Sequence, residues 1–322
     1  MTPPALPPVS GREPRPMVSV VMPTFNRADL LGDSARMVLA QTWRDLELIV
    51  ADDHSTDETP AIVAALARDD ARVRYVRPPV KGGVTAVVNA GIQQSRGEFV
   101  QICHDHDIYL PRLTERLADV LQRHPLVVYV HPGRQGCDHD GRPLAHRYFV
   151  CNYPEVTAGP DWRRFMLGRL DSPVTALSMI RRSALERSGL FDPDFGAVSD
   201  VEMWLRLCAY GDVGYVNERL LYVRGRDARH PYSGAAWELT AQVIRAHRQH
   251  LPAAYAGGHL AIMRLRKEIA IDVALARDFL NSARHRRWAE VEAGRAYLRQ
   301  HGGWLSRGVA LGASWLVAEP TR

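Results

Sequence analysis

The sequence predicts an α/β fold built on a parallel sheet, and three observations support this prediction. Short apolar runs alternate with amphipathic segments of helical length through the first third of the chain. Polar side chains follow directly after several of these runs, where open α/β sheets bind their ligands. A length of 322 residues with 46% hydrophobic content suffices for one large α/β domain plus an appendage.

The first two strands are predicted from a β-branched run and a second apolar run, each followed by polar residues. Residues 18–22 form one run, and Pro23 interrupts it before a helix expected over residues 28–41. Residues 46–51 form the second run, which ends at the paired carboxylates Asp52 and Asp53. Strand, helix and strand at this spacing are typical of a parallel α/β sheet.

Two further strands continue the pattern. Residues 72–76 are predicted as the third strand, and Gly82 and Gly83 open a helix that leads into a fourth strand at residues 98–103. Because the carboxyl ends of parallel strands meet at one edge, the side chains that follow them should converge on one crevice. These side chains belong to Phe25, Asp52, Asp53, Asp105, His106 and Asp107.

The fourth strand runs into four consecutive side chains that can bind a metal, His104, Asp105, His106 and Asp107. Carboxylate and imidazole at the end of a buried strand suit a divalent cation that also holds phosphate oxygens. A solvated polar turn would give the same composition, so this stretch alone leaves both interpretations open.

The chain carries a second copy of the Asp-His-Asp tripeptide at residues 138–140. Gly141 follows it at once, and Asp-Gly is a strong hairpin-turn signal. The sequence therefore predicts a structural turn for this copy.

Several segments resemble a family 2 glycosyltransferase of the GT-A fold. Its nucleotide-sugar-binding half is similar to VSVVMPTFNRADLL, QTWRDLELIVADDHSTDET, GGVTAVVNAGIQQSRGEFV and HDHDIYLP, and its acceptor half to SMIRRSALERSGLFD and SDVEMWLRLCAYGDVGYVNERLLYVR. The resemblance covers residues 17 to about 230. It implies an α/β fold with a GT-A-type, Rossmann-like mixed sheet flanked by helices. The catalytic domain would span residues 17–232, divided into a nucleotide-sugar-binding half (17–111) and an acceptor half (112–232).

The resemblance also implies a nucleotide-sugar site. Phe25 stands where the family places an aromatic or hydrophobic residue against the base, and Asp53 matches the carboxylate that hydrogen-bonds the base, with Asp52 as the second choice. The whole set implied for this site is Pro23, Thr24, Phe25, Asn26, Asp52, Asp53, Gly83, Asn89 and Asp105.

The implied metal site departs from the family pattern. The family usually ends this strand Asp-x-Asp-Asp, so His106 stands in the place of its principal metal-binding aspartate. The expected ligands are His106, Asp107 and Asp105, holding Mn²⁺ or Mg²⁺. Imidazole can bind Mn²⁺, whereas Mg²⁺ prefers oxygen. Three alternatives stay open: His106 binds a softer cation, Asp105 and Asp107 take over, or metal dependence is weak.

Asp200 corresponds to the family's catalytic base in an inverting transfer. Such a base takes the proton of the acceptor hydroxyl as it attacks the anomeric carbon. Without the resemblance, Asp200 would be interpreted as a helix cap, and Glu202 is the backup candidate for the base. The alternative function is a non-catalytic nucleotide- or glycan-binding relative, which the unusual HDHD sequence favours and Asp200 disfavours.

The two ends of the chain differ from the centre. Residues 1–16 are rich in proline and are expected to be a disordered tail, because they lack the apolar core of a secretion signal. Residues 233–322 predict a helical extension that packs on the catalytic domain or on a second subunit in a homodimer. Its segment 304–317 is apolar with tryptophan near both ends, which suits a packed terminal helix or a helix in the membrane interface.

Net charge and cysteine content limit the classes of binding partner and the compartment that the sequence suggests. A net charge of +5 suits a phosphate-bearing substrate or an anionic membrane, and without a clustered basic stripe we expect no nucleic acid. The four cysteines show no CxxC spacing, which favours reduced thiols in a cytoplasmic protein, in solution or peripheral on the inner face of the membrane. The resemblance implies a nucleoside-diphosphate sugar as donor and a glycan, a lipid-linked compound or a small molecule as acceptor, in polysaccharide or glycoconjugate biosynthesis.

Overall fold

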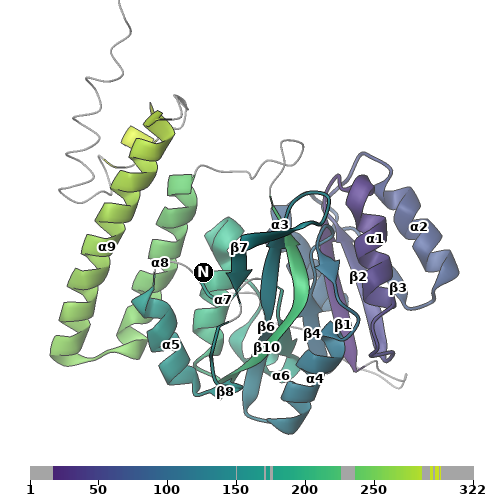
Figure 1. Cartoon of the computed structure of the whole chain (residues 1–322), viewed down its shortest axis with the longest axis horizontal. Coiled ribbons are helices and arrows are strands. Elements are labelled where there is room, and N and C mark those ends of the chain that lie inside the picture. Colours follow the sequence, from purple (N-terminus) through teal and green to yellow (C-terminus); the bar gives the residue numbers. More distant parts are fainter. Residues whose placement is uncertain are drawn as a thin grey trace, which may run out of the picture. The chain divides into compact units, whose positions relative to one another are not determined.

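The fold is known from a computed structural model of the chain (Figure 1). It describes residues 17–149, 151–169, 172–174, 177–225, 236–284, 291–292, 294–296 and 298. The described residues fall into two compact units, one within 1–163 and 173–231 and the other within 164–172 and 232–322. The predicted tail at residues 1–16 and the apolar segment 304–317 lie outside the described residues.

The first unit is built on one mixed sheet, to which the described residues contribute ten strands in the order β3-β2-β1-β4-β9-β6-β10-β5, with β7 paired to β6 and β8 to β10. The strands are β1 (Val18–Thr24), β2 (Leu46–Asp52), β3 (Val73–Val76), β4 (Phe99–Ile102), β5 (Ile108–Tyr109), β6 (Val127–Cys137), β7 (Pro143–Phe149), β8 (Val156–Thr157), β9 (Met179–Arg181) and β10 (Asp212–Arg224).

The predicted parallel arrangement holds for the first four strands of this order. Val18 of β1 lies opposite Leu46 of β2 and Phe99 of β4, and β3 extends the parallel set on the other side of β2. Beyond β4 the directions mix, because β9 runs antiparallel to both β4 and β6 while β10 runs parallel to β6. The mixed α/β sheet expected from the resemblance is therefore confirmed.

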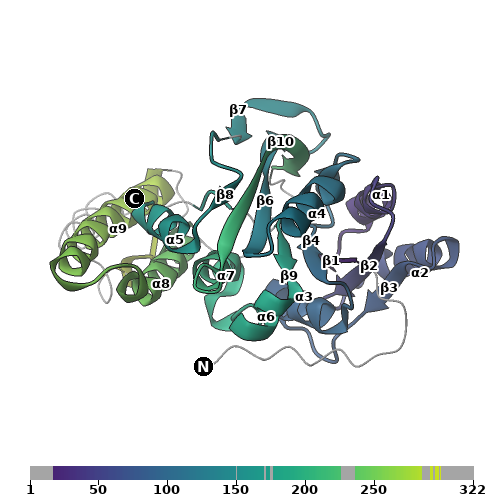
Figure 2. The same cartoon turned by 90° about the horizontal axis from the view of Figure 1, so that it is seen from below.

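Helices cover both faces of the sheet (Figure 2). The helices of the first unit are α1 (Ala28–Leu39), α2 (Thr59–Asp69), α3 (Gly83–Gln94), α4 (Leu113–Arg123), α6 (Arg182–Ser188) and α7 (Ser199–Leu207), with a 3₁₀ helix at Pro193–Val198. Helix α5 (Gly159–Gly168) begins in the first unit and ends in the second. Helices α1 and α4 lie on one face, and α3, α6 and α7 lie on the other. Close packing fixes α3, because a Cβ added at Gly91 would lie 2.5 Å from Cγ1 of Val21 in β1.

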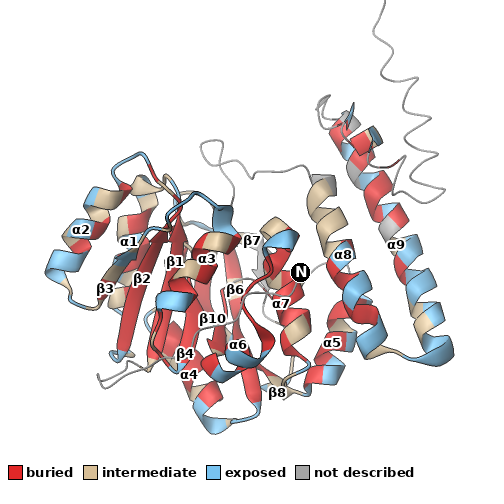
Figure 3. Ribbon diagram, turned by 180° about the vertical axis from the view of Figure 1, so that it is seen from behind, coloured by how far each residue is buried: buried red, intermediate tan, exposed pale blue. Residues whose placement is uncertain are grey.

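The core lies in the central strands (Figure 3). All seven residues of β1 and all seven of β2 are buried, as expected for parallel strands covered by helices on both sides. The carboxyl ends of these strands are therefore held rigidly, and the loops that follow them are positioned by the core.

The second unit contains two long helices, α8 (Ala236–Ala254) and α9 (Gly257–Arg284), joined by a two-residue connection. They confirm the helices predicted for the C-terminal extension. Leu251 of α8 and Leu275 and Phe279 of α9 are among their buried residues. Within the described part of the chain, no helix combines the length and the apolar character needed to cross a membrane.

Candidate active site at the carboxyl edge of the sheet

The loops after β1, β2 and β4 lie at one edge of the sheet. The backbone N–H of Asp53, directly after β2, donates to the carbonyl of Thr24 at the end of β1 (2.9 Å). The backbone N–H of Cys103, directly after β4, donates to the carbonyl of Val21 in β1 (3.0 Å). The side chains predicted from the strand ends therefore belong to adjacent loops of one unit.

Asn26 connects the loop after β1 to the loop after β2 through hydrogen bonds. Its backbone is in the left-handed region (φ 49°), which asparagine tolerates better than most residues. Its N–H donates to Oγ of Ser55 (2.9 Å), and its Oδ1 accepts from the N–H of Thr56 (2.8 Å). The structure therefore gives Asn26 a positioning role in this edge.

The paired carboxylates after β2 differ in their surroundings. Asp52 is fully buried, and its oxygens accept from Ser55 (N, 2.9 Å; Oγ, 2.5 Å), the hydroxyl of Tyr75 (2.5 Å) and Nη1 of Arg77 (3.3 Å). Burial, followed by the hydrogen bond to Asp52, raises the pKa of the Tyr75 hydroxyl. These contacts indicate that Asp52 stabilises the loop that follows β2.

Asp53 faces the glycine turn that opens α3. Its Oδ1 accepts from the N–H of Gly82 (2.9 Å), and its Oδ2 accepts from the N–H of Gly83 (3.1 Å), where φ is +76°. A carboxylate can accept about four hydrogen bonds, so these two leave capacity for a ligand N–H.

Exposed apolar side chains gather around the same glycine turn. Phe25 after β1, Val80 before the turn and Val84 after it are all exposed, and Nζ of Lys81 lies 3.5 Å from the centroid of the Phe25 ring. Exposed large apolar side chains at the rim of a polar site are typical of ligand-binding surfaces.

Asn89 joins α3 to the segment around Phe191. Its side-chain amide donates to the carbonyl of Phe191 (2.8 Å), and its Oδ1 accepts from the N–H of Phe191 (3.0 Å). The hydroxyl of Thr85 likewise donates to the carbonyl of Gly196 (3.0 Å) and lies 3.0 Å from Oγ of Ser199. Helix α3 thus holds the segment that precedes Asp200, and the amide of Asn89 is engaged in packing.

The turn after β4 brings His104, His106 and Asp107 together. One donor atom from each can be chosen so that all three lie within 4.8 Å of one another. The two imidazole rings are stacked at 5.3 Å, and Nδ1 of His104 lies 3.1 Å from Oδ2 of Asp107. Asp105, predicted as a ligand, instead contacts Nδ1 of His106 (2.8 Å), and Nε2 of His106 lies 3.8 Å from Oδ1 of Asp107.

Asp107 is the buried centre of this cluster. Its Oδ1 accepts from the N–H of Arg224 at the end of β10 (2.8 Å), and its carbonyl accepts from the hydroxyl of Ser34 in α1 (2.9 Å). Burial opposes ionisation, but the hydrogen bond with His104 and the positive charges of His104 and His106 lower the pKa of Asp107. Burial likewise opposes protonation of His104, but its hydrogen bond with Asp107 and the negative charges of Asp107, Asp105 and Asp200 raise its pKa.

Asp200 lies in the first turn of α7, where Oδ1 accepts from the N–H of Val201 (2.8 Å). Burial raises the pKa of Asp200 to about 6, while that hydrogen bond and the positive charges of His104 and Arg134 act in the opposite direction. The carboxylate therefore lies within electrostatic reach of the histidine cluster. It is ionised at neutral pH and is more basic than an ordinary aspartate.

Glu202, the backup candidate, is fully engaged elsewhere. It is buried, and both of its oxygens accept from Nε of Arg206 (3.0 and 3.1 Å), with a further bond from Nη2 to Oε2 (2.8 Å). Arg206 also donates to the carbonyls of Ser188 and Leu190 (2.5 and 2.8 Å). Glu202 therefore stabilises the packing of α7 by holding Arg206.

The second Asp-His-Asp copy forms a turn, as predicted. It joins β6 to β7, Gly141 has a φ of +86°, and the N–H of Arg142 donates to Oδ1 of Asp138 (2.8 Å). Arg224 donates through Nη1 to the carbonyl of His139, so the turn supports the strand end that holds Asp107.

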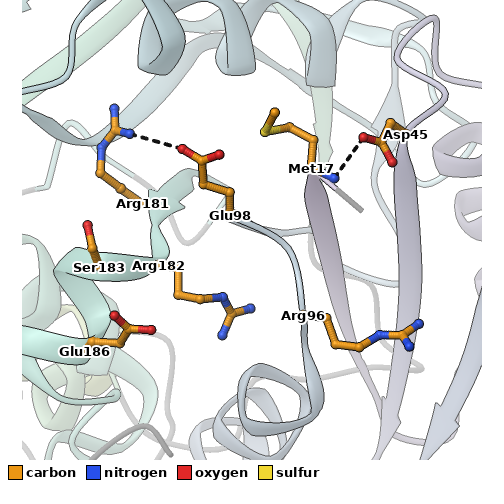
Figure 4. A pocket seen from close by; sticks show the side chains of 8 residues that line it. All are labelled: Met17, Asp45, Arg96, Glu98, Arg181, Arg182, Ser183 and Glu186. Carbon is orange, nitrogen blue, oxygen red and sulfur yellow. Dashed lines mark hydrogen bonds and ion pairs between the residues drawn. The ribbon is translucent and has the colours of Figure 1, made fainter. Parts of the chain in front are cut away.

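A cavity of about 430 Å³ lies at the opposite edge of the sheet, where β1 and β4 begin (Figure 4). Several of its charged groups are already engaged: Arg181 pairs with Glu98 (3.7 Å), and Asp45 accepts from the N–H of Met17 (3.1 Å). The residues predicted from the strand ends do not line it. The cavity and the candidate site therefore lie at opposite edges of the sheet.

Comparison with known proteins identifies relatives of the chain. The sequence model described as "Glycosyl transferase family 2" matches residues 19–189, which is more than half of the chain. The GalNAc(5)-diNAcBac-PP-undecaprenol beta-1,3-glucosyltransferase of Campylobacter jejuni is 41% identical over 93 residues, 29% of this chain and 30% of that protein. An uncharacterized glycosyltransferase of Rickettsia typhi is 28% identical over 224 residues, 66% of this chain and 65% of that protein. These matches span between about a third and two thirds of the relatives' lengths.

Two solved structures show the same fold. Staphylococcus aureus TarS 1–349 in complex with UDP-GlcNAc has a TM-score of 0.61 at 17% identity, covering 92% of this chain and 79% of that one. A mannosyltransferase from Pyrobaculum calidifontis in complex with GDP-Man and Mn²⁺ has a TM-score of 0.51 at 20% identity, covering 95% and 82%.

Proposed function

Because this chain belongs to glycosyl transferase family 2, we propose that it transfers a sugar from a nucleoside-diphosphate sugar to an acceptor hydroxyl with inversion. The observation that carries the proposal is the position and pKa of Asp200. Asp200, whose pKa burial raises to about 6, interacts electrostatically with His104 and belongs to the unit that holds the nucleotide candidates.

The nucleotide is proposed to bind over the loops after β1 and β2. A base stacked on the exposed ring of Phe25 would lie next to Asp53, which keeps acceptor capacity for a base N–H. Lys81, on the same ring, could then direct its ammonium group to the diphosphate. Pro23 and Thr24 shape this loop, and Asn26 and Asp52 hold it. Gly83 orients Asp53, and Asn89 holds the segment around Phe191.

The histidine cluster is proposed to hold the divalent cation. Bonds of about 2.0–2.3 Å to one ion require donor atoms that lie within a few ångströms of one another, and His104, His106 and Asp107 meet this condition. Asp105 would fix the orientation of His106 through Nδ1, as carboxylates do for many metal-binding histidines. Two imidazoles and one carboxylate suit Mn²⁺ better than Mg²⁺. Such an ion would stabilise the charge on the departing diphosphate.

The base step is a single displacement. Asp200 takes the proton of the acceptor hydroxyl while its oxygen forms a bond to the anomeric carbon. The bond from that carbon to the diphosphate oxygen breaks at the same time, and the nucleoside diphosphate leaves. Because Asp200 must be ionised, transfer should fall about tenfold per pH unit as the pH drops below about 6.

The test is Asp200→Asn, which keeps the shape of the side chain and removes the base. Transfer should fall at least about a hundredfold while donor binding is unchanged. Asp194→Asn, an exposed carboxylate in the preceding 3₁₀ helix, is the matched control and should keep full activity. A screen of UDP-, GDP- and dTDP-sugars by thermal shift would first identify the donor. Near-normal transfer by Asp200→Asn would refute the base assignment, and donor affinity without any transfer would favour a non-catalytic binding protein.

The structural neighbours carry UDP-GlcNAc or GDP-Man, which supports a nucleoside-diphosphate sugar as donor here. The name of the Campylobacter jejuni relative refers to an undecaprenol-linked substrate, which favours a lipid-linked acceptor among the three acceptor classes. Supplying the transferase with lipid-linked and water-soluble acceptors in parallel would distinguish them.

A further inference from the structure

Helix α9 carries an apolar stripe on its exposed side. Ten large hydrophobic side chains are exposed in the described part of the chain, and five of them lie on α9 with 45–63% of their surface accessible. They are Ile262, Leu265, Ile269, Val273 and Leu280. Their spacings of 3, 4, 4 and 7 residues place them on one side of the helix. Figure 3 shows exposed residues along α9 in pale blue.

Most of the buried residues of α9 lie on a different side of the helix from this stripe. The buried residues of α9 include Leu275 and Phe279, together with Lys267, whose Nζ donates to the carbonyl of Arg169 (2.5 Å). Asp272 and Ser282 are also buried, and so is Ala276, which lies on the stripe's side of the helix. The five large apolar side chains of the stripe nevertheless face outward. A contiguous exposed apolar stripe on a water-soluble surface indicates a binding partner.

Basic side chains line one edge of the stripe. Arg266, Arg277 and Arg284 are exposed, and each lies four residues after a member of the stripe, which places it about 40° around the helix. On the opposite edge, Glu268 is ion-paired with Arg248 of α8. The exposed side of α9 thus combines apolar side chains with positive charge on one border.

We propose that α9 lies flat on an anionic lipid surface, with the stripe in the headgroup boundary and the three arginines on lipid phosphates. An amphipathic helix with this pattern binds in the plane of a membrane interface. Its 28 residues extend about 42 Å, so α9 offers a long line of contact. This surface lies outside the proposed transferase site, and the proposal does not depend on that activity.

The charges along the edges of the stripe favour a lipid surface over a second copy of the chain as the binding partner of α9. Two copies of α9 packed antiparallel along the stripe would place like edges together, with arginines opposite arginines, which is unfavourable. Packed parallel, the arginine edge would meet the edge that holds Glu268, whose charge is already paired with Arg248. Anionic phosphates carry the charge opposite to that of the arginine edge, so a lipid surface avoids the repulsion of the antiparallel pair.

The experiment is flotation of the full chain with vesicles of phosphatidylcholine alone or with 30% phosphatidylglycerol. We expect binding to the anionic vesicles only, and weaker binding as salt is raised. Ile262→Ser combined with Ile269→Ser should reduce binding at least tenfold. Reversing Arg266, Arg277 and Arg284 to glutamate should do so more strongly, because each arginine contributes about fivefold near an anionic surface. Arg264→Glu, exposed on another side of α9, is the matched control and should change binding by less than the reversal of any one edge arginine.

Two results would overturn the proposal. Unchanged flotation of the stripe variant, shown by circular dichroism to keep its helix content, would place any lipid contact elsewhere in the chain. Sedimentation that shows a dimer which dissociates in the stripe variant, without vesicle binding by the wild type, would assign the stripe to a second copy.

Discussion

The same tripeptide, Asp-His-Asp, occurs twice in this chain and has a different role in each place. At residues 105–107 it ends in Asp107, fully buried between His104 and the N–H of Arg224. At residues 138–140 it ends in the exposed Asp140, which pairs with the exposed Arg142 (2.8 Å). Because the residue types are identical, the different roles of the two copies must result from the burial and the hydrogen-bond partners of each carboxylate.

The largest expected difference between the two copies is in stability. Asp107→Asn removes the charge that holds His104 and should lower the free energy of unfolding by about 3 kcal/mol, as for other broken buried ion pairs. Asp140→Asn removes an exposed pair and should cost at most about 0.5 kcal/mol. Chemical denaturation of both variants measures this directly. Equal losses would show that burial does not separate the two copies.

The next difference is in metal binding and tests the cluster without measuring catalysis. His106→Asp restores the carboxylate usual in the family and should shift the preference from Mn²⁺ towards Mg²⁺, by about tenfold in the ratio of the two affinities. His139→Asp makes the same change in the turn copy and should leave the ratio unaltered. Calorimetric titration with each ion gives both ratios. If the ratio were the same in wild type and His106→Asp, His106 would not be a ligand.

Much of the fold could be predicted because its signals are local. The apolar runs of β1 and β2 and the polar residues after them predicted the parallel half of the sheet. Strand β9 has three residues and enters between β4 and β6 in the antiparallel direction. Nothing local in so short a segment specifies its two partners, so this half came only from the resemblance.

The same contrast applies to the site. Local sequence placed Asp53 and Asp107 at strand ends, but it could not show which contacts their oxygens make. Asp53 accepts from glycine amides about 30 residues away, and the amide of Asn89 pairs with the backbone of Phe191, 102 residues away. His104 was recognised as able to bind metal, yet only the folded turn shows its ring beside Asp107, with Asp105 behind His106.

The smallest expected effect concerns the glycine that ends the second copy. Gly141 has a φ of +86°, a conformation that costs an L-residue about 1–2 kcal/mol. A Cβ there would lie 2.8 Å from Cδ1 of Ile108, the end of a flexible side chain, so the backbone conformation should account for most of the cost. Gly141→Ala should therefore lower the free energy of unfolding by about 1 kcal/mol in chemical denaturation. Gly168→Ala, with ordinary φ and no atom within 4 Å of the added Cβ, is the control and should cost nothing measurable. Because Arg224 bonds both this turn and Asp107, Gly141→Ala should also weaken metal binding slightly. A stable Gly141→Ala variant with unchanged metal affinity would show that the second copy neither needs its turn nor supports the first.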